Sequence, residues 1–295
     1  MKPIALAGLA AMVVVSGCMR GGPPVVSHAH YVVGDGYQIG GVWYYPREDY
    51  GYDRTGLASV SGDDAPAVTA DGEAYDADAM AAASQILQLP CIVQVTNLQT
   101  GRQLLLRVND RGPANPGRII AVTPRAARLL GIPAGGAAEV RVTIQRDASQ
   151  ALADSLGGGI RIAAAPMGGF QATSLAPPPG VAQAGGSTVV QTDRANTGSI
   201  TETVPPLKLP VTLTQVPPSP GALYIQSGAF GQEFDAFRQS ARVSGLPNAH
   251  VVAISGGGRM LYGVRSGPYY TVQQADAALA ASLGAGAVDA TIIVQ

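Results

Sequence analysis

Short, mostly apolar runs separated by turn-forming residues dominate the middle of the chain and predict β-strands. Residues 92–96 (IVQVT) and 104–108 (LLLRV) are two such runs. The segment between them, 97–101 (NLQTG), contains turn-forming residues and predicts a hairpin connection. These strands belong to a segment of folded-domain character that extends from about residue 56 to 146.

One short helix is predicted within this β-rich segment. Thr123 is a suitable N-cap, Pro124 fits the first helical position, and Gly131 can end the helix. A β-rich segment with a single intervening helix indicates a small barrel.

The last part of the chain, 221–295, repeats a strand–helix–strand pattern twice. This βαβ-βαβ order predicts one four-stranded antiparallel sheet with both helices on one face. The expected strands are 223–226, 249–254, 261–264 and 290–294, and the expected helices are 232–243 and 272–283.

Between the two folded segments, residues 147–220 consist largely of Ala, Gly, Pro, Ser and Thr. Proline clusters occur at 177–179 and near the end of this span, at 217–220. Such a composition offers too few large apolar side chains to offset the entropy lost on ordering, so we expect a flexible linker.

The N-terminus has the features of an export signal. Lys2 precedes an apolar run at 4–15, which is too short to span a bilayer but suits a signal-peptide core. The sequence Val-Ser-Gly then leads directly into Cys18, which is typical of a bacterial lipoprotein, so we expect residues 1–17 to be removed and Cys18 to be lipidated. Several acyl chains on one residue give stable membrane attachment. Met19 after the cysteine favours the outer membrane over inner-membrane retention.

Residues 18–55 are rich in Gly, Tyr and His and predict a tether that partly folds onto the next domain. Its Trp43 is more often a packing residue in such clusters than a sugar-stacking one. His28 and His30 are expected to be flexible surface residues, because no other metal ligand lies near them in the sequence.

Charge and cysteine content exclude some classes of function. The net charge is −1 and charged residues make up 13% of the chain, so the basic excess that neutralises nucleic-acid phosphates is missing. Cys91 has no disulfide partner once Cys18 is lipidated, and we expect it to be a small buried apolar residue. No cofactor or metal site is predicted.

Several motifs of the barrel segment resemble the rare lipoprotein A family. They occur in the family's order, at 69–76 (TADGEAYD), 95–98 (VTNL), 109–113 (NDRGP) and 117–120 (GRII). This resemblance implies a double-psi β-barrel and an endolytic lytic transglycosylase that cuts naked peptidoglycan strands lacking stem peptides.

The C-terminal segment resembles the SPOR domain at 224–230 (YIQSGAF) and 262–269 (YGVRSGPY). That domain binds denuded glycan at division septa, which implies an envelope lipoprotein on the periplasmic face of the outer membrane, enriched at septa, with division proteins as possible partners. The residues that this resemblance assigns to glycan binding are Tyr224, Gln226, Phe230 and Arg265.

The same resemblance assigns the chemistry to three positions. Glu73 matches the family's glutamate and Asp110 its aspartate, whereas Ser84 stands at the position of its histidine. Cleavage of this kind needs an acid that protonates the leaving oxygen and then, as a base, draws the sugar's own hydroxyl onto the anomeric carbon. A histidine titrates near neutral pH and can carry a proton, whereas a serine hydroxyl only donates and accepts hydrogen bonds. The three histidines, His28, His30 and His250, all lie outside the barrel segment.

Further departures keep a second function open. Val60 and Ser61 replace two aromatic residues of the family, and Ala121 replaces an aspartate. Three such losses around one groove are also consistent with a catalytically silent lipoprotein that binds or scaffolds glycan.

Each acidic candidate has a structural alternative. Asp110 beside Gly112 and Pro113 can cap backbone amides, and Glu73 can be an exposed turn residue. The neighbouring Asp71, Asp76 and Asp78 are expected to be solvated or turn-forming.

Overall fold

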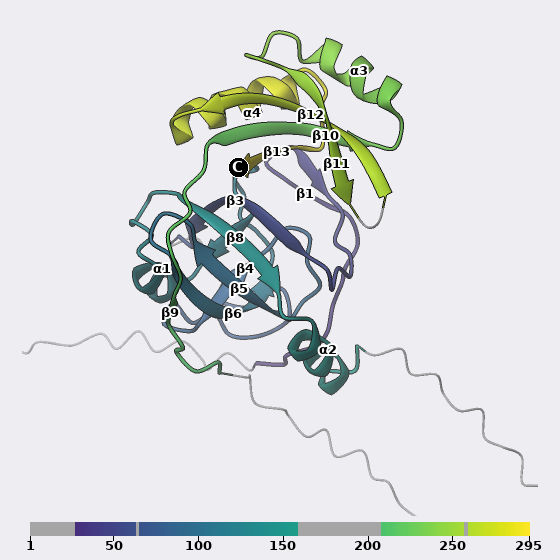
Figure 1. Cartoon of the computed structure of the whole chain (residues 1–295). Helices are drawn as coiled ribbons and strands as arrows, with labels where there is room; N and C mark the ends of the chain where they lie inside the picture. The colour runs from purple at the N-terminus through teal and green to yellow at the C-terminus, as the bar shows by residue number, and fades with distance from the viewer. Residues whose placement is uncertain (1–26, 63–64, 159–207, 257–258) are drawn as a thin grey trace, which may run out of the picture.

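A computed structural model describes residues 27–62, 65–158, 208–256 and 259–295 (Figure 1). Cys18, the predicted signal peptide and the central part of the expected linker lie outside the described residues. Within the described ranges, no helix is long and apolar enough to cross a membrane.

Six strands form the barrel that the sequence predicts. Their order is β4-β7-β3-β8-β5-β6, and a further pairing of β4 with β6 closes the ring. The β3–β7 and β4–β6 pairs are parallel and the others antiparallel. The strands are β3 (Asp53–Val60), β4 (Ala81–Ala83), β5 (Cys91–Asn97), β6 (Arg102–Asp110), β7 (Ile120–Val122) and β8 (Ala138–Ile144). The double-psi barrel expectation is thereby confirmed.

The barrel encloses one apolar core. Along β5 and β6, Val93, Val95, Leu104 and Leu106 are fully or almost fully buried. Cys91 belongs to the same core as a free thiol, and its burial raises the pKa of the thiol to about 12. Cys91 is therefore the inert apolar residue that the sequence predicts.

The predicted helix is present as α1 (Pro124–Leu130). The Thr123 hydroxyl accepts a hydrogen bond from the Ala126 amide (3.4 Å) and donates one to the Ala79 carbonyl (2.7 Å). Gly131 ends the helix in the left-handed conformation, with φ of 77°, where glycine has no Cβ penalty.

A second helix, α2 (Arg146–Ser155), lies in the span expected to be a linker from residue 147. Ser149 connects it to β5, because its hydroxyl accepts from the Ile92 amide (2.9 Å) and donates to the Ile92 carbonyl (3.1 Å). Leu152 and Ala153 are also buried. The folded part of the chain therefore continues past the expected start of the linker.

The other end of the expected linker also packs on the barrel. Leu209 contacts the barrel core, and β9 (Thr214–Gln215) pairs with β6. Residues 208–220 therefore lie along the barrel, as the green segment that contains β9 shows in Figure 1.

The segment before β3 folds partly onto the barrel, as predicted. β1 (Tyr37–Ile39) and β2 (Val42–Tyr44) form a hairpin, and the Tyr37 hydroxyl donates to the Gln85 carbonyl (2.8 Å). Trp43 is 57% exposed and stacks on the ring of Tyr45, so it packs on a neighbouring side chain at the surface and not in the core.

The C-terminal segment forms the predicted four-stranded sheet in the order β11-β12-β10-β13, antiparallel throughout. Both helices cover the same face of the sheet (Figure 1). The elements are β10 (Leu223–Phe230), α3 (Glu233–Arg242), β11 (His250–Gly256), β12 (Arg259–Tyr269), α4 (Val272–Gly284) and β13 (Ala290–Val294).

The C-terminal domain docks on the barrel through β13 and α4. The Thr55 hydroxyl donates to the Val294 carbonyl (2.7 Å) and accepts from the Val294 amide (3.3 Å). The Arg118 guanidinium contacts both Asp276 carboxylate oxygens, at 2.7 and 2.9 Å. Leu57 of the barrel is fully buried within the apolar core of the C-terminal domain. The two domains therefore share a packed interface.

Candidate functional site

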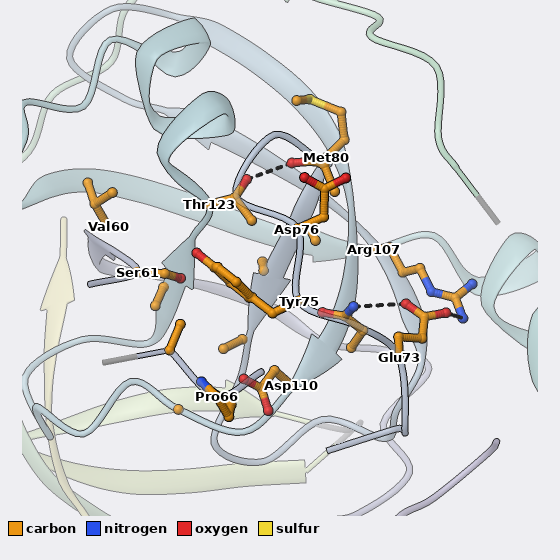
Figure 2. A pocket seen from close by; sticks show the side chains of 18 of the residues that line it. Val60, Ser61, Pro66, Glu73, Tyr75, Asp76, Met80, Arg107, Asp110 and Thr123 are labelled. Atoms are coloured by element: carbon orange, nitrogen blue, oxygen red, sulfur yellow. Dashed lines mark hydrogen bonds and ion pairs between the residues drawn. The ribbon is translucent and has the colours of Figure 1, made fainter. Parts of the chain in front are cut away.

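A groove of about 770 Å³ opens on the barrel and contains both predicted acidic residues (Figure 2). Glu73 and Asp110 line it, and so do the three positions that depart from the family pattern, Val60, Ser61 and Ala121. The volume is in the range of ordinary ligand pockets. The structure thus brings these five residues, which are spread over 61 positions of the sequence, to one groove.

Glu73 is buried, with 5% of its surface exposed. Its Oε1 accepts a hydrogen bond from Arg107 Nη2 (2.5 Å), and its Oε2 accepts one from Asn109 Nδ2 (2.9 Å). Figure 2 shows the carboxylate turned toward Arg107. Because both oxygens are held from β6, the alternative that Glu73 is an exposed turn residue is excluded.

Asp71 was expected to be solvated or turn-forming; it is fully buried, not solvated, and its carboxylate accepts from the amide two residues further on, as in a turn. Its Oδ1 accepts from the Thr69 hydroxyl (2.7 Å) and from the Glu73 amide (3.2 Å), and its Oδ2 lies 3.6 Å from Arg107 Nη2. Burial raises the pKa of Asp71 to about 6, and the nearby Glu73 charge acts in the same direction. The carboxylates of Asp71 and Glu73 therefore share the Arg107 guanidinium at the wall of the groove.

Asp110 is half-buried and caps the backbone, as its structural alternative predicts. Its Oδ1 accepts from the Ala70 amide (2.9 Å) and the Arg111 amide (2.8 Å), whereas its Oδ2 accepts from no described residue. Burial raises the pKa of Asp110. The carboxyl thus combines a structural role with a groove-lining position that leaves one oxygen available to a ligand.

Ser84 is buried next to the groove but does not line it. Its hydroxyl accepts from the Leu87 amide (3.4 Å), and its own amide donates to the Asp110 carbonyl (3.0 Å). The serine side chain therefore stabilises the turn that follows β4.

His28 and His30 lie beside the loop that carries Glu73. The His28 amide donates to the Gly72 carbonyl (2.9 Å), and the His30 amide donates to the Asp71 carbonyl (2.9 Å). Both side chains are exposed at the surface, as expected, and their backbone is hydrogen-bonded to the loop that carries Glu73. In the described part of the chain, no group of three His, Cys, Asp or Glu side chains is placed to hold a metal ion.

Sequence reasoning missed Arg107 and Asn109, the two residues that hold Glu73. A signal was present, because Arg107 interrupts the apolar run 104–108 and a charge within a buried strand is almost always paired. Two further cations, Arg125 and Lys208, line the groove with exposed side chains.

The predicted glycan-binding residues of the C-terminal domain lie on β10 and β12. Leu223, Ile225 and Ser227 are buried toward the helices, so Tyr224 and Gln226 occupy the opposite face of the sheet. The structure brings Gln226 and Arg265 together, with Arg265 Nε donating to Gln226 Oε1 (3.4 Å).

Phe230, at the end of β10, is partly buried and approaches Gly228. A register shift in the β10–β12 pairing between Gln226 and Ala229 interrupts the alternation before Phe230, and Phe230 packs against the core of the C-terminal domain. The open face around Tyr224, Gln226 and Arg265 carries aromatic, amide and guanidinium groups, which are the side chains that stack on and hydrogen-bond to sugars.

Residues 52–142 match a family described as lytic transglycolase, and residues 219–293 match the SPOR domain family. A Pseudomonas aeruginosa (strain UCBPP-PA14) protein named endolytic peptidoglycan transglycosylase RlpA is 35% identical over 254 residues, which cover 82% of this chain and 71% of that protein. A Rickettsia bellii protein of the same name is 37% identical over 122 residues, which cover 40% of this chain and 54% of that protein.

A Rickettsia felis relative of the same name is 37% identical over 117 residues, which cover 38% of this chain and 51% of the relative. The chain therefore spans about half the length of the two Rickettsia relatives. A solved RlpA SPOR domain from Pseudomonas aeruginosa is 23% identical, with a TM-score of 0.23, and its match covers 25% of this chain and 99% of that structure.

Proposed function

The chain belongs to the rare lipoprotein A family, and from this premise we propose that it is an endolytic peptidoglycan transglycosylase that cleaves glycan strands lacking stem peptides. The observation that carries the proposal is the groove that contains both Glu73 and Asp110. The relatives named above carry the corresponding activity in their names.

Glu73 supplies the proton transfers of this reaction. As an acid it protonates the oxygen that leaves the anomeric carbon, and the glycosidic bond breaks. The same carboxylate then takes the proton of the sugar's own C6 hydroxyl as that oxygen bonds to the anomeric carbon. Atoms balance without water, and the product has a 1,6-anhydro end. One acid–base group is sufficient, unlike the two carboxylates of ordinary hydrolysis.

Asp110 supports the same step electrostatically. Its Oδ2, which accepts no hydrogen bond from a described residue, can face the positive charge that develops on the sugar ring as the bond breaks. Ser84 takes no direct part in this mechanism, because its hydroxyl is bound to backbone amides away from the groove. Glu73 is therefore the group on which the chemistry depends most.

Substitution of Glu73 by glutamine tests this assignment. Glu73→Gln keeps the shape of the side chain and removes its titrating proton, so release of 1,6-anhydro products from denuded strands should fall about 10²–10⁴-fold. Asp110→Asn should reduce release less. Glu233→Gln on α3 is the matched control, since Glu233 is exposed and lies outside the groove. Equal release by wild type and Glu73→Gln would contradict the assignment.

A second function is favoured by one specific observation. Val60, Ser61 and Ala121 all line the groove, where two aromatic side chains and an acid would otherwise be expected. In this alternative the barrel is catalytically silent and the chain binds or scaffolds denuded glycan. Binding of such strands by wild type without product release would support it.

Features in the C-terminal domain and at the lipoprotein motif support a location in the cell envelope. The C-terminal sheet face with Tyr224, Gln226 and Arg265 supports binding to denuded glycan at division septa. The lipoprotein motif that ends at Cys18 supports attachment to the periplasmic face of the outer membrane, where division proteins are candidate partners. Cys18→Ala should remove the chain from the membrane fraction, and retention there after a carbonate wash would contradict the anchor.

A further inference from the structure

Arg107 lines the groove and occupies an unusual, buried position in it. It belongs to β6, which contributes apolar side chains to the barrel core, and it is itself only 4% exposed. Its Nη2 atom faces the carboxylates of both Glu73 and Asp71. Its Nε and Nη1 have no partner among the described residues. A buried guanidinium with unpaired donors is costly. Its conformation is therefore set by the two carboxylates rather than by a complete hydrogen-bond network.

Asp71 holds Glu73 from the other side. The Glu73 amide donates to Asp71 Oδ1, and the Thr69 hydroxyl donates to the same oxygen. Asp71 Oδ2 accepts no hydrogen bond from a described residue and faces Arg107 Nη2 at 3.6 Å. The loop itself is fixed from outside, by His28 and His30 on one flank and by the Asp110 carboxylate at Ala70.

We propose that Arg107 and Asp71 are positioning residues for the reaction proposed above, Arg107 by holding the Glu73 carboxylate and Asp71 by holding its backbone and sharing the same guanidinium. Neither side chain needs to touch the sugar for this role. The inference rests on the proposed function of Glu73 and assigns to its two neighbours the task of keeping it in register with the groove.

Because Asp71 and Glu73 share the Arg107 guanidinium, the position of the Glu73 carboxylate depends on pH. Asp71 has a pKa raised to about 6 by its burial, so it changes charge close to neutral pH. Below about pH 6 Asp71 is neutral, and the Arg107 guanidinium pairs with the Glu73 carboxylate alone. Above about pH 6 the ionised Asp71 competes for Arg107 Nη2, so Arg107 holds the Glu73 carboxylate less firmly. The other charged or titratable side chains near this loop are His28, His30 and Asp110, and both histidines are exposed. A titrating carboxyl thus lies beside Glu73, whereas Ser84 cannot titrate in this range.

The test is the pH profile of strand cleavage by the purified full chain. Wild type should show a fall in kcat as pH rises through about 6, and Asp71→Asn should remove this step. Arg107→Lys keeps the positive charge but loses the planar guanidinium with its several N–H donors. We therefore expect kcat to fall about ten-fold while KM changes less than about two-fold. The matched controls are Asp53→Asn and Arg141→Lys, an exposed ion pair of the barrel outside the groove. Both controls should keep the wild-type profile.

The failure of this inference differs from the failure of the proposed function. If wild type cleaves strands, Glu73→Gln does not, and Asp71→Asn keeps the pH step, the positioning role is overturned and the function stands. If wild type cleaves nothing, the proposed function fails, and the ¹³C carboxyl resonance of Glu73 decides the inference. That resonance should shift with the titration of Asp71 in wild type and lose this shift in Asp71→Asn. If the pH dependence of this resonance is identical in wild type and Asp71→Asn, the proposed coupling between Asp71 and Glu73 is overturned.

Discussion

Among single residues, Asp71 predicts a pH effect on stability. Its pKa of about 6 lies above the ordinary value near 4, so the folded chain binds this proton more tightly than the unfolded chain. The stabilising contribution is present below about pH 4 and is lost as pH rises through about 6. Between pH 4 and pH 7, Asp71→Asn should therefore gain about 2–3 kcal/mol of unfolding free energy relative to wild type, measured by urea unfolding.

Asp53→Asn provides the control of opposite sign. Its hydrogen bond with Arg141 lowers the pKa of Asp53, so its stabilising contribution is present at neutral pH and is lost in acid. The stability of this variant should approach that of wild type as pH falls. Parallel curves for wild type and Asp71→Asn would show that Asp71 does not titrate between these limits.

The residues of the site differ in how far the sequence predicts them. Glu73 and Asp110 could be selected because short motifs fix them to a known chemistry, and both line the groove. Arg107 was not selected, because nothing in a linear sequence states which carboxylate a buried arginine meets. The burial of Asp71 was not predicted for a related reason. An aspartate beside glycine is usually solvated, and its burial depends on β6 and the segment at residue 30 packing over it.

Secondary-structure elements were predictable where local signals and periodicity agreed. The helix α1 has its cap, its proline and its terminal glycine at the expected positions, and the C-terminal elements follow the predicted order. The helix α2 was missed because its Ala- and Ser-rich sequence resembles the linker that follows it. Only three of its residues are buried, so its packing on β5 leaves little hydrophobic pattern.

The contact between α2 and the barrel can be tested at Ser149. Ser149→Ala removes the hydroxyl that satisfies both the amide and the carbonyl of Ile92, and a buried group without its partner costs about 1–3 kcal/mol. Ser155→Ala, which loses only a hydrogen bond within the same helix, should cost less than about 0.5 kcal/mol. Urea unfolding measures both. Equal stabilities of the two variants would mean that α2 does not depend on this contact.

At the scale of the whole molecule, the sequence predicted two folded domains but not their interface. Gly117 and Arg118 were assigned to a barrel motif, yet both face the C-terminal domain. A Cβ at Gly117 would approach the Asp276 carboxylate, and the Arg118 guanidinium binds that carboxylate with two hydrogen bonds. Contacts between residues 158 positions apart leave no periodic trace in a sequence, so this docking was not predictable.

A double-mutant cycle on Arg118→Gln and Asp276→Asn tests the docking. The two charge-assisted hydrogen bonds are at short range and Arg118 is buried, so the coupling free energy should be about 1–2 kcal/mol. The exposed pair Arg128 and Asp78 is the control, with an expected coupling below about 1 kcal/mol. Urea unfolding of the full chain supplies both values. A coupling no larger than that of the control would indicate that this ion pair does not hold the domains together.

We propose that this chain cuts glycan by intramolecular transfer, with Glu73 as the acid–base group. Mass analysis of the products from denuded strands distinguishes this transfer from hydrolysis. Wild type should release fragments with 1,6-anhydro ends, lighter than hydrolysis products by one water, and Glu73→Gln should not release them. Reducing ends formed with added water would contradict transfer. Release of 1,6-anhydro fragments that is indifferent to both Glu73→Gln and Asp110→Asn would contradict the site.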